Sequence, residues 1–144
     1  MKVSTRTRYS IRAAMELALN FEKGPLQLRL IAERQDISVK YLEQLMSVLM
    51  SGGFVRSVRG ARGGYMLARD PDTVRVSEIF HCLEGKVATV DCVEDSQVCP
   101  RSSGCSARKL WQAVEKAIED TLSSYTLKNL IDMGEQADSA NYQI

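Results

Sequence analysis

Three of the chain's four cysteines lie in one polar segment, Asp91 to Cys105, with the sequence DCVEDSQVCPRSSGC. The segment has too few apolar residues to be ordered by a hydrophobic core. Its thiols could order it instead by binding a metal. The spacing Cys92-x6-Cys99-x5-Cys105 is wider than that of most structural zinc sites and lacks a second Cys-x2-Cys pair. Iron-sulfur clusters accept thiolates at irregular spacing. The spacing alone leaves a cluster, a zinc ion and free redox-active thiols as alternatives.

A second segment suited to chemistry runs from Ile37 to Leu67, where a helical pattern passes into a hairpin pattern. Ser38 is the predicted N-cap, and Gly52 and Gly53 supply the backbone freedom that ends a helix. Two strand-like stretches follow, joined by an Arg- and Gly-rich turn at residues 60–64. We therefore predict a recognition helix followed by a wing. The apolar face of that helix comprises Leu42, Leu45, Met46, Leu49 and Met50.

The opposite face of the predicted helix carries side chains suited to reading DNA in a major groove. Gln44 can make a bidentate contact with adenine, and Lys40 can reach a phosphate or a guanine. Tyr41 and Ser38 can hydrogen-bond phosphate. Glu43 can accept a hydrogen bond from cytosine, although an exposed helical carboxylate with no base contact explains it equally well.

Arg59 and Arg62 flank the tip of the predicted wing, which is rich in glycine. A guanidinium group fits the negative potential of a narrow minor groove. Glycines at this turn allow the backbone to approach a partner closely. We therefore predict that both arginines contact DNA.

Charge is divided unevenly along the chain, although the formal net charge is only +1. Residues 1–69 contain 12 Lys and Arg against 5 Asp and Glu, whereas residues 70–144 contain 7 against 13. A basic half that coincides with a helix and a hairpin is expected for contact with phosphates. The acidic half is expected to serve another purpose.

Two further helices precede the predicted recognition helix at helix-turn-helix spacing. The first opens at Thr5 or Thr7 and ends near Gly24, and the second covers 27–35. The first helix carries Arg6, Arg8 and Arg12, which are either solvated or in contact with phosphates. Arg6 and Arg8 are favoured as phosphate contacts because they lie nearest the basic end.

The segment after the hairpin is predicted to add a short strand over 74–76 and a small helix over 77–83. Cys82 on this helix is expected to be a small buried hydrophobe. The only histidine, His81, is expected to be structural or solvated and not a metal ligand.

A helix of about twenty residues is predicted from Ser106, with an apolar stripe too broad for an isolated helix. A second copy of the same helix would cover the stripe in a two-fold dimer, and burial within one chain is the alternative. Thr126 is predicted to cap a short final helix through Met133, followed by a frayed tail from Gly134. The stripe comprises Leu110, Trp111, Val114, Ala117, Ile118, Thr121, Leu122 and Tyr125.

Several segments together resemble the family of bacterial winged helix-turn-helix transcription regulators of the IscR, NsrR, RirA and CymR type. They are STRTRYSIRAAMELA, the block from IAERQ through YLEQL and RGARGGYML to ARDP, VSEIF, the three-cysteine segment and the helix near Leu110. The resemblance covers nearly the whole chain. It implies DNA contacts at Tyr41, Glu43, Gln44 and Arg59. It also implies that Cys92, Cys99 and Cys105 hold an iron-sulfur cluster, with [2Fe-2S] favoured over [4Fe-4S].

The resemblance fails at the fourth cluster ligand. IscR-like proteins have a histidine three residues after the last cysteine, where this chain has Arg108, which cannot ligate iron. NsrR-like members use an aspartate near the start of the partner's first helix, where this chain reads Thr7-Arg8-Tyr9. The fourth ligand is therefore unassigned, with a small molecule, solvent or one of six side chains as candidates: Glu84, Asp91, Glu94, Asp95, His81 and Cys82.

These observations predict a mainly α fold with a small β-hairpin wing. We expect a winged helix-turn-helix domain over residues 1–83, a cysteine loop over 84–105, and a dimerisation helix with a short C-terminal helix and tail over 106–144. The expected function is that of a homodimeric regulator which binds a pseudo-palindromic operator in double-stranded DNA under the control of the cluster. A clusterless thiol-redox or metabolite-responsive regulator of the same fold is the alternative.

An enzyme and a membrane protein are not expected. The sequence has no nucleophile motif, no phosphate-binding loop and no paired carboxylates at a catalytic spacing. No apolar run approaches the roughly 20 residues that span a bilayer, and the first residues lack the pattern of a signal peptide. A cytoplasmic location is predicted.

Overall fold

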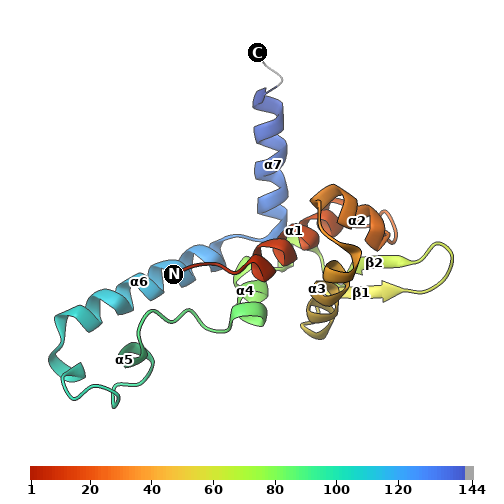
Figure 1. Ribbon diagram of the computed structural model, residues 1–144. Coiled ribbons are helices and arrows are strands. Elements are labelled where there is room, and N and C mark those ends of the chain that lie inside the picture. Colours follow the sequence, from red (N-terminus) through yellow and green to blue (C-terminus); the bar gives the residue numbers. More distant parts are fainter. Residues whose placement is uncertain (142–144) are drawn as a thin grey trace.

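The computed structural model describes residues 1–141 and is mainly helical, with one two-stranded antiparallel hairpin. Figure 1 shows the wing and the cysteine loop at opposite ends of the molecule, with α6 extending toward the cysteine loop. In chain order the elements are α1 (Thr5–Leu19), α2 (Leu28–Gln35), α3 (Val39–Ser51), β1 (Val55–Val58), β2 (Gly64–Leu67), the 3-10 turn η1 (Pro71–Thr73), α4 (Val76–Glu84), α5 (Asp91–Glu94), η2 (Ser102–Gly104), α6 (Ser106–Ser124) and α7 (Leu127–Asn141).

Side-chain caps set the starts of the first and third helices. The Ser4 hydroxyl accepts a hydrogen bond from the Thr7 amide at 3.1 Å, and α1 begins at Thr5 as expected. The Ser38 hydroxyl accepts from the Tyr41 amide at 3.1 Å, which confirms the predicted cap of α3. Such caps satisfy amide groups that have no partner within the helix.

The core lies where α1, α2 and α3 meet. Ala13 and Ala14 of α1 are fully buried, and their small side chains let α3 approach closely. α3 buries the apolar face predicted for it, except that Met50 is only partly buried; the buried members are Leu42, Leu45, Met46 and Leu49. Burial of this face fixes how α3 is rotated about its own axis.

The wing pairs β1 with β2 in the register Val55 to Leu67 and Val58 to Gly64. Leu26, just before α2, adds a one-residue bridge to Tyr65, with both backbone hydrogen bonds at 2.9 Å. The wing is therefore attached to the helix-turn-helix through the backbone as well as through the core.

The short strand predicted over residues 74–76 is reduced to a one-residue bridge at Arg75, and Val76 already begins α4, so that prediction is wrong. This stretch instead pairs with the connection between α6 and α7, through a bond of 2.9 Å from the Val76 amide to the Tyr125 carbonyl. A second bond of 3.0 Å joins the Leu127 amide to the Val74 carbonyl. Val74 and Leu127 are fully buried, so apolar packing holds the two distant stretches together.

The final helix is longer than predicted. Thr126 caps α7 as expected, its hydroxyl accepting from the Asn129 amide at 3.2 Å. However, α7 continues through Gly134 to Asn141, so the expected end at Met133 is wrong. One glycine costs a helix only about 1 kcal/mol relative to alanine, and α7 is anchored by buried Leu127 and Ile131. Of the expected frayed tail, residues 142–144 lie outside the described residues.

Within residues 1–141, none of the helices combines the length and the apolar character needed to cross a membrane.

Replacing Gly64 by alanine should destabilise the fold by about 1 to 3 kcal/mol. A methyl group at this position would overlap the backbone carbonyl of Leu26 in the bridge to the wing. Chemical denaturation followed by circular dichroism measures the change. Gly134→Ala is the matched control, since its added methyl meets nothing within 4 Å and should stabilise α7 by up to about 1 kcal/mol. Equal stability of Gly64→Ala and wild type would contradict this account of the wing.

Candidate DNA interface and cysteine loop

The side chains predicted to read DNA lie together on the uncovered face of α3. Ser38, Lys40, Glu43 and Gln44 are exposed, and Tyr41 is half-buried. They occupy the cap and the first two turns of α3, which is the part of a recognition helix that meets base edges. The structure therefore brings together all five residues chosen from the helical pattern.

Tyr41 is half-buried because an aromatic side chain of α1 supports it. The rings of Tyr9 and Tyr41 meet edge to face, with centroids 6.2 Å apart. The Arg12 guanidinium lies over the Tyr9 ring, 5.2 Å from its centroid. The two aromatic side chains thus link α1 directly to the reading face of α3.

The Arg12 side chain is itself held by a polar chain that joins α1 to α2. Its Nε donates to Gln35 Oε1 at 2.6 Å, and Gln35 Nε2 donates to Glu16 Oε1 at 2.5 Å. Glu16 also accepts from Arg34 at 3.1 Å. Sequence patterns did not indicate this network, because its residues come from separate helices and have no characteristic spacing. It orients α1 and α2 relative to one another.

Both arginines predicted at the tip of the wing are exposed. Arg59 precedes a tight turn in which the Gly63 amide donates to the Gly60 carbonyl at 3.0 Å, and Arg62 lies within that turn. Gly60 has φ of 115°, a conformation that residues with a Cβ rarely adopt. The turn thus presents two cations beyond the end of the strands.

The cysteine loop brings Cys92 and Cys105 to the same end of α6. Cys92 lies in α5, Cys105 is the N-cap of α6, and Cys99 lies in the turn between them; all three are half-buried free thiols. Arg108 joins the two ends of the segment. Its Nε donates to the Cys92 carbonyl at 2.6 Å, and its amide donates to Cys105 Sγ at 3.4 Å.

The donor chemistry of the cysteine loop fits an iron-sulfur cluster, because three thiols lie in one short polar segment and an amide already points at Cys105 Sγ. Over residues 1–141, however, no three side chains of His, Cys, Asp or Glu gather closely enough to hold a metal ion. The loop in the described conformation would therefore have to close around a cluster.

Two of the candidate fourth ligands are engaged elsewhere. Glu84 Oε1 accepts from Thr7 Oγ1 at 2.6 Å and from the Ser4 amide at 3.0 Å. Hydrogen bonds from Ser4 and Thr7 hold the pKa of the Glu84 carboxyl below its usual range. His81 Nε2 lies 2.8 Å from Glu119 Oε2 and connects α4 to α6, in agreement with the expected structural role.

Cys82 is exposed, so the expectation of a buried thiol is wrong. The buried residues of α4 are Val76, Ser77, Ile79 and Phe80, and Cys82 falls outside that face. Its sulfur lies beside Gly52 at the end of α3. The remaining acidic candidates, Asp91, Glu94 and Asp95, belong to or adjoin α5 and form no metal-sized group with the cysteines in residues 1–141.

The apolar stripe of α6 is only partly covered within one chain. None of the residues of this helix is buried, and Leu110 and Trp111 are 56% and 39% exposed. A shallow hollow of about 370 Å³ follows the stripe. Its lining residues are Val114, Ala117, Ile118, Thr121 and Leu122.

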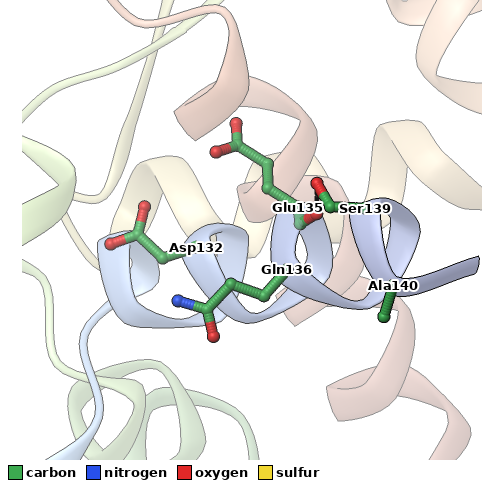
Figure 2. A pocket seen from close by; sticks show the side chains of 5 residues that line it. All are labelled: Asp132, Glu135, Gln136, Ser139 and Ala140. Atoms are coloured by element: carbon green, nitrogen blue, oxygen red, sulfur yellow. Dashed lines mark hydrogen bonds between the residues drawn. The ribbon is translucent and has the colours of Figure 1, made fainter. Parts of the chain in front are cut away.

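Another surface hollow, shown in Figure 2, lies along α7. All five residues that line it come from this one helix, and most are polar. Side chains of a single helix cannot enclose a ligand, so this hollow is not treated as a binding site. Its residues are Asp132, Glu135, Gln136, Ser139 and Ala140.

Comparison with known proteins gives consistent matches across the chain. Residues 3–133 match the family model Rrf2, described as iron-dependent transcriptional regulator. Protein rrf2 of Nitratidesulfovibrio vulgaris is 39% identical over 131 residues, which cover 91% of this chain and 87% of that protein.

Solved structures agree with the sequence matches. The structure of CymR, described as the global cysteine regulator of B. subtilis, superposes with a TM-score of 0.80 at 37% identity, covering 92% of this chain and 98% of CymR. The structure of T. potens IscR gives a TM-score of 0.78 at 40% identity, covering 95% and 90%. These likenesses confirm the predicted winged-helix fold.

Replacing Tyr9 by alanine should weaken DNA binding about two- to tenfold, because edge-to-face aromatic pairs contribute about 0.5 to 1.5 kcal/mol. Loss of the ring leaves Tyr41 free to adopt orientations that do not suit binding. Fluorescence anisotropy with a labelled duplex measures the affinity. Tyr9→Phe keeps the ring and should bind like wild type; equal affinities of the alanine and phenylalanine variants would show that the pair does not position Tyr41.

Proposed function

The chain belongs to the Rrf2 family of transcriptional regulators, and we propose that it is a homodimer that binds a pseudo-palindromic operator and responds through its cysteine loop. The observation that carries this proposal is the uncovered face of α3, where five polar side chains stand beside a wing tipped with two arginines.

In the proposed complex α3 enters the major groove while the wing follows the backbone into the adjacent minor groove. Gln44 reads adenine, and Lys40 contacts a guanine or a phosphate. Ser38 and Tyr41 hydrogen-bond phosphates, and Glu43 accepts from cytosine. The wing guanidinium groups of Arg59 and Arg62 are attracted by the negative potential of the minor groove.

The exposed part of the α6 stripe supports dimerisation. An apolar helix face exposed to water is unfavourable, and a second copy of the same face removes both from water. Two-fold pairing of the helices would place two copies of α3 in symmetric positions, which suits an operator with two related half-sites. Dimerisation and DNA binding therefore depend on each other in this proposal.

Cys92, Cys99 and Cys105 are the proposed ligands of an iron-sulfur cluster, with [2Fe-2S] favoured. The donor set of soft thiols supports this assignment, as does the family description as iron-dependent. When bound, such a cluster supplies a redox- and iron-sensitive group. Arg108 occupies the position three residues after the last cysteine and donates to the Cys92 carbonyl, so the fourth ligand has to come from elsewhere.

A clusterless regulator that responds to thiol oxidation or to a metabolite is the second candidate. The observation in its favour is that the three thiols are free and do not gather into a metal-sized group within residues 1–141. A related protein, CymR of Staphylococcus aureus, has been solved in a form described as oxidized. Both candidates use the same loop and the same DNA-binding surface.

The family relationship implies a regulatory and not a catalytic role, because the family model is described as a transcriptional regulator and the relatives CymR and IscR are named transcriptional regulators. A protein that binds a bacterial operator has to be in the same compartment as the chromosome, which is the cytoplasm. We therefore propose a cytoplasmic location.

Replacing Arg59 by alanine should weaken operator binding by about 1 to 3 kcal/mol and make it less sensitive to salt, because a guanidinium contact with DNA is lost. The affinity is measured across a salt series with a duplex enriched from a random-sequence pool by the wild-type protein. Sedimentation should show that the variant has the same mass as wild type. If both affinity and salt dependence are unchanged, the wing does not bind as proposed.

Protein purified without oxygen should contain about two irons and two acid-labile sulfides per chain if the cluster is [2Fe-2S], and about four of each if it is [4Fe-4S]. Elemental analysis and the visible spectrum measure this. Replacing Cys92, Cys99 and Cys105 together by serine should remove the iron, whereas Cys82→Ser should retain it. Iron-free protein with titratable thiols, or bound zinc, would favour the second candidate and leave DNA binding intact.

A further inference from the structure

The first turn of α1 lies beside the reading face of α3, and the two helices form a small hollow. Its volume is about 250 Å³, and it is lined by Arg6 of α1 together with four residues of α3: Tyr41, Gln44, Leu45 and Val48. Two of these, Tyr41 and Gln44, belong to the proposed reading face. A cation from another helix thus stands at the edge of the surface that α3 presents to DNA.

The structure distinguishes Arg6 from the other arginines of α1. Arg12 is committed within the protein, since it donates to Gln35 at 2.6 Å and stacks on Tyr9. Arg8 is exposed but does not line the hollow. Arg6 is exposed, lines the hollow and makes no salt bridge with a carboxylate of the described residues. Of the three, only Arg6 combines a free charge with contact to α3.

The position of Arg6 is fixed by the residues on either side of it. Thr7 is fully buried, and its hydroxyl donates to Glu84 at 2.6 Å. Ser4 caps α1 through the Thr7 amide, and its own amide donates to Glu84 at 3.0 Å. Oε1 of Glu84 thus accepts two hydrogen bonds from the first turn of α1 and its cap. It sets the backbone of that turn without forming a salt bridge to Arg6.

We propose that Arg6 binds a backbone phosphate of DNA at this hollow, on the strand that borders the groove occupied by α3. A guanidinium group is suited to phosphate, and the polar side chains of Tyr41 and Gln44 line the same space. A phosphate held here is next to the residue proposed to read adenine, so it sets the register of α3 along the groove. The inference rests on the proposed binding of DNA and adds a contact outside both α3 and the wing.

Replacing Arg6 by glutamine tests the proposal. Affinity is measured by anisotropy across a salt series with two probes, a duplex enriched from a random-sequence pool by the wild-type protein and a scrambled duplex of the same length. Both affinities should fall by a similar factor, roughly tenfold, because a phosphate contact carries no sequence information. The slope of log affinity against log salt should become shallower by about one for each protomer.

Lys109→Gln is the matched control, since it removes the same charge from the exposed side of α6 and should change neither slope. Arg6→Lys should restore much of the lost salt dependence, because it restores the charge. An unchanged slope in Arg6→Gln would overturn the proposal, as would a loss confined to the enriched duplex with altered base preference. If the wild-type protein enriches no duplex at all, the proposed function fails, and this inference fails with it.

Discussion

The packing of α3 against α1 is the constraint on which the rest of the structure depends. Leu42, Met46 and Leu49 are fully buried, so α3 cannot rotate about its axis without exposing them. Successive residues of a helix are separated by 100°, and a rotation of one position would carry Gln44 toward the core. The residues available to read DNA are therefore selected by the hydrophobic core. Burial of these side chains sets the orientation of α3. The contact between Tyr9 and Tyr41 then adds to it, and the hydrogen bonds of Arg12 and Gln35 hold α1 against α2.

Much of the DNA-binding half was predictable, because its information is local. The apolar period of α3, the cap at Ser38 and the glycine-rich turn beyond β1 each depend on a few neighbouring residues. The contacts between Tyr9 and Tyr41, and between Arg12 and Gln35, were not predictable from such patterns. They depend on how separate helices pack, and their residue types occur equally often on solvated surfaces.

The errors in the C-terminal half have the same physical origin. Residues 74–76 had the composition of a strand, but only Val74 and Arg75 are extended, and their partner is the connection before α7, which adjacent sequence does not reveal. Gly134 suggested a helix end, yet packing of α7 on α1 outweighs the modest cost of one glycine. Cys82 looked like a core residue by type, although its position on α4 turns it away from the buried face. For the cysteines of the loop, spacing indicated the chemistry and not the geometry.

The attachment of α6 has a mechanical consequence. Its C-terminal end is fastened to the winged-helix part, where Arg75 donates to the Ser123 carbonyl at 2.6 Å and His81 meets Glu119. Its other end begins at Cys105, at the far side of the molecule (Figure 1). A helix of 19 residues is about 28 Å long, so a movement of about 2 Å at the cysteine end turns the fastened end by only about 4°. Because a force applied at the cysteine end acts at the full length of the helix from the fastened end, a small force on the cysteine loop would exert a large torque on the contacts that join α6 to the winged helix.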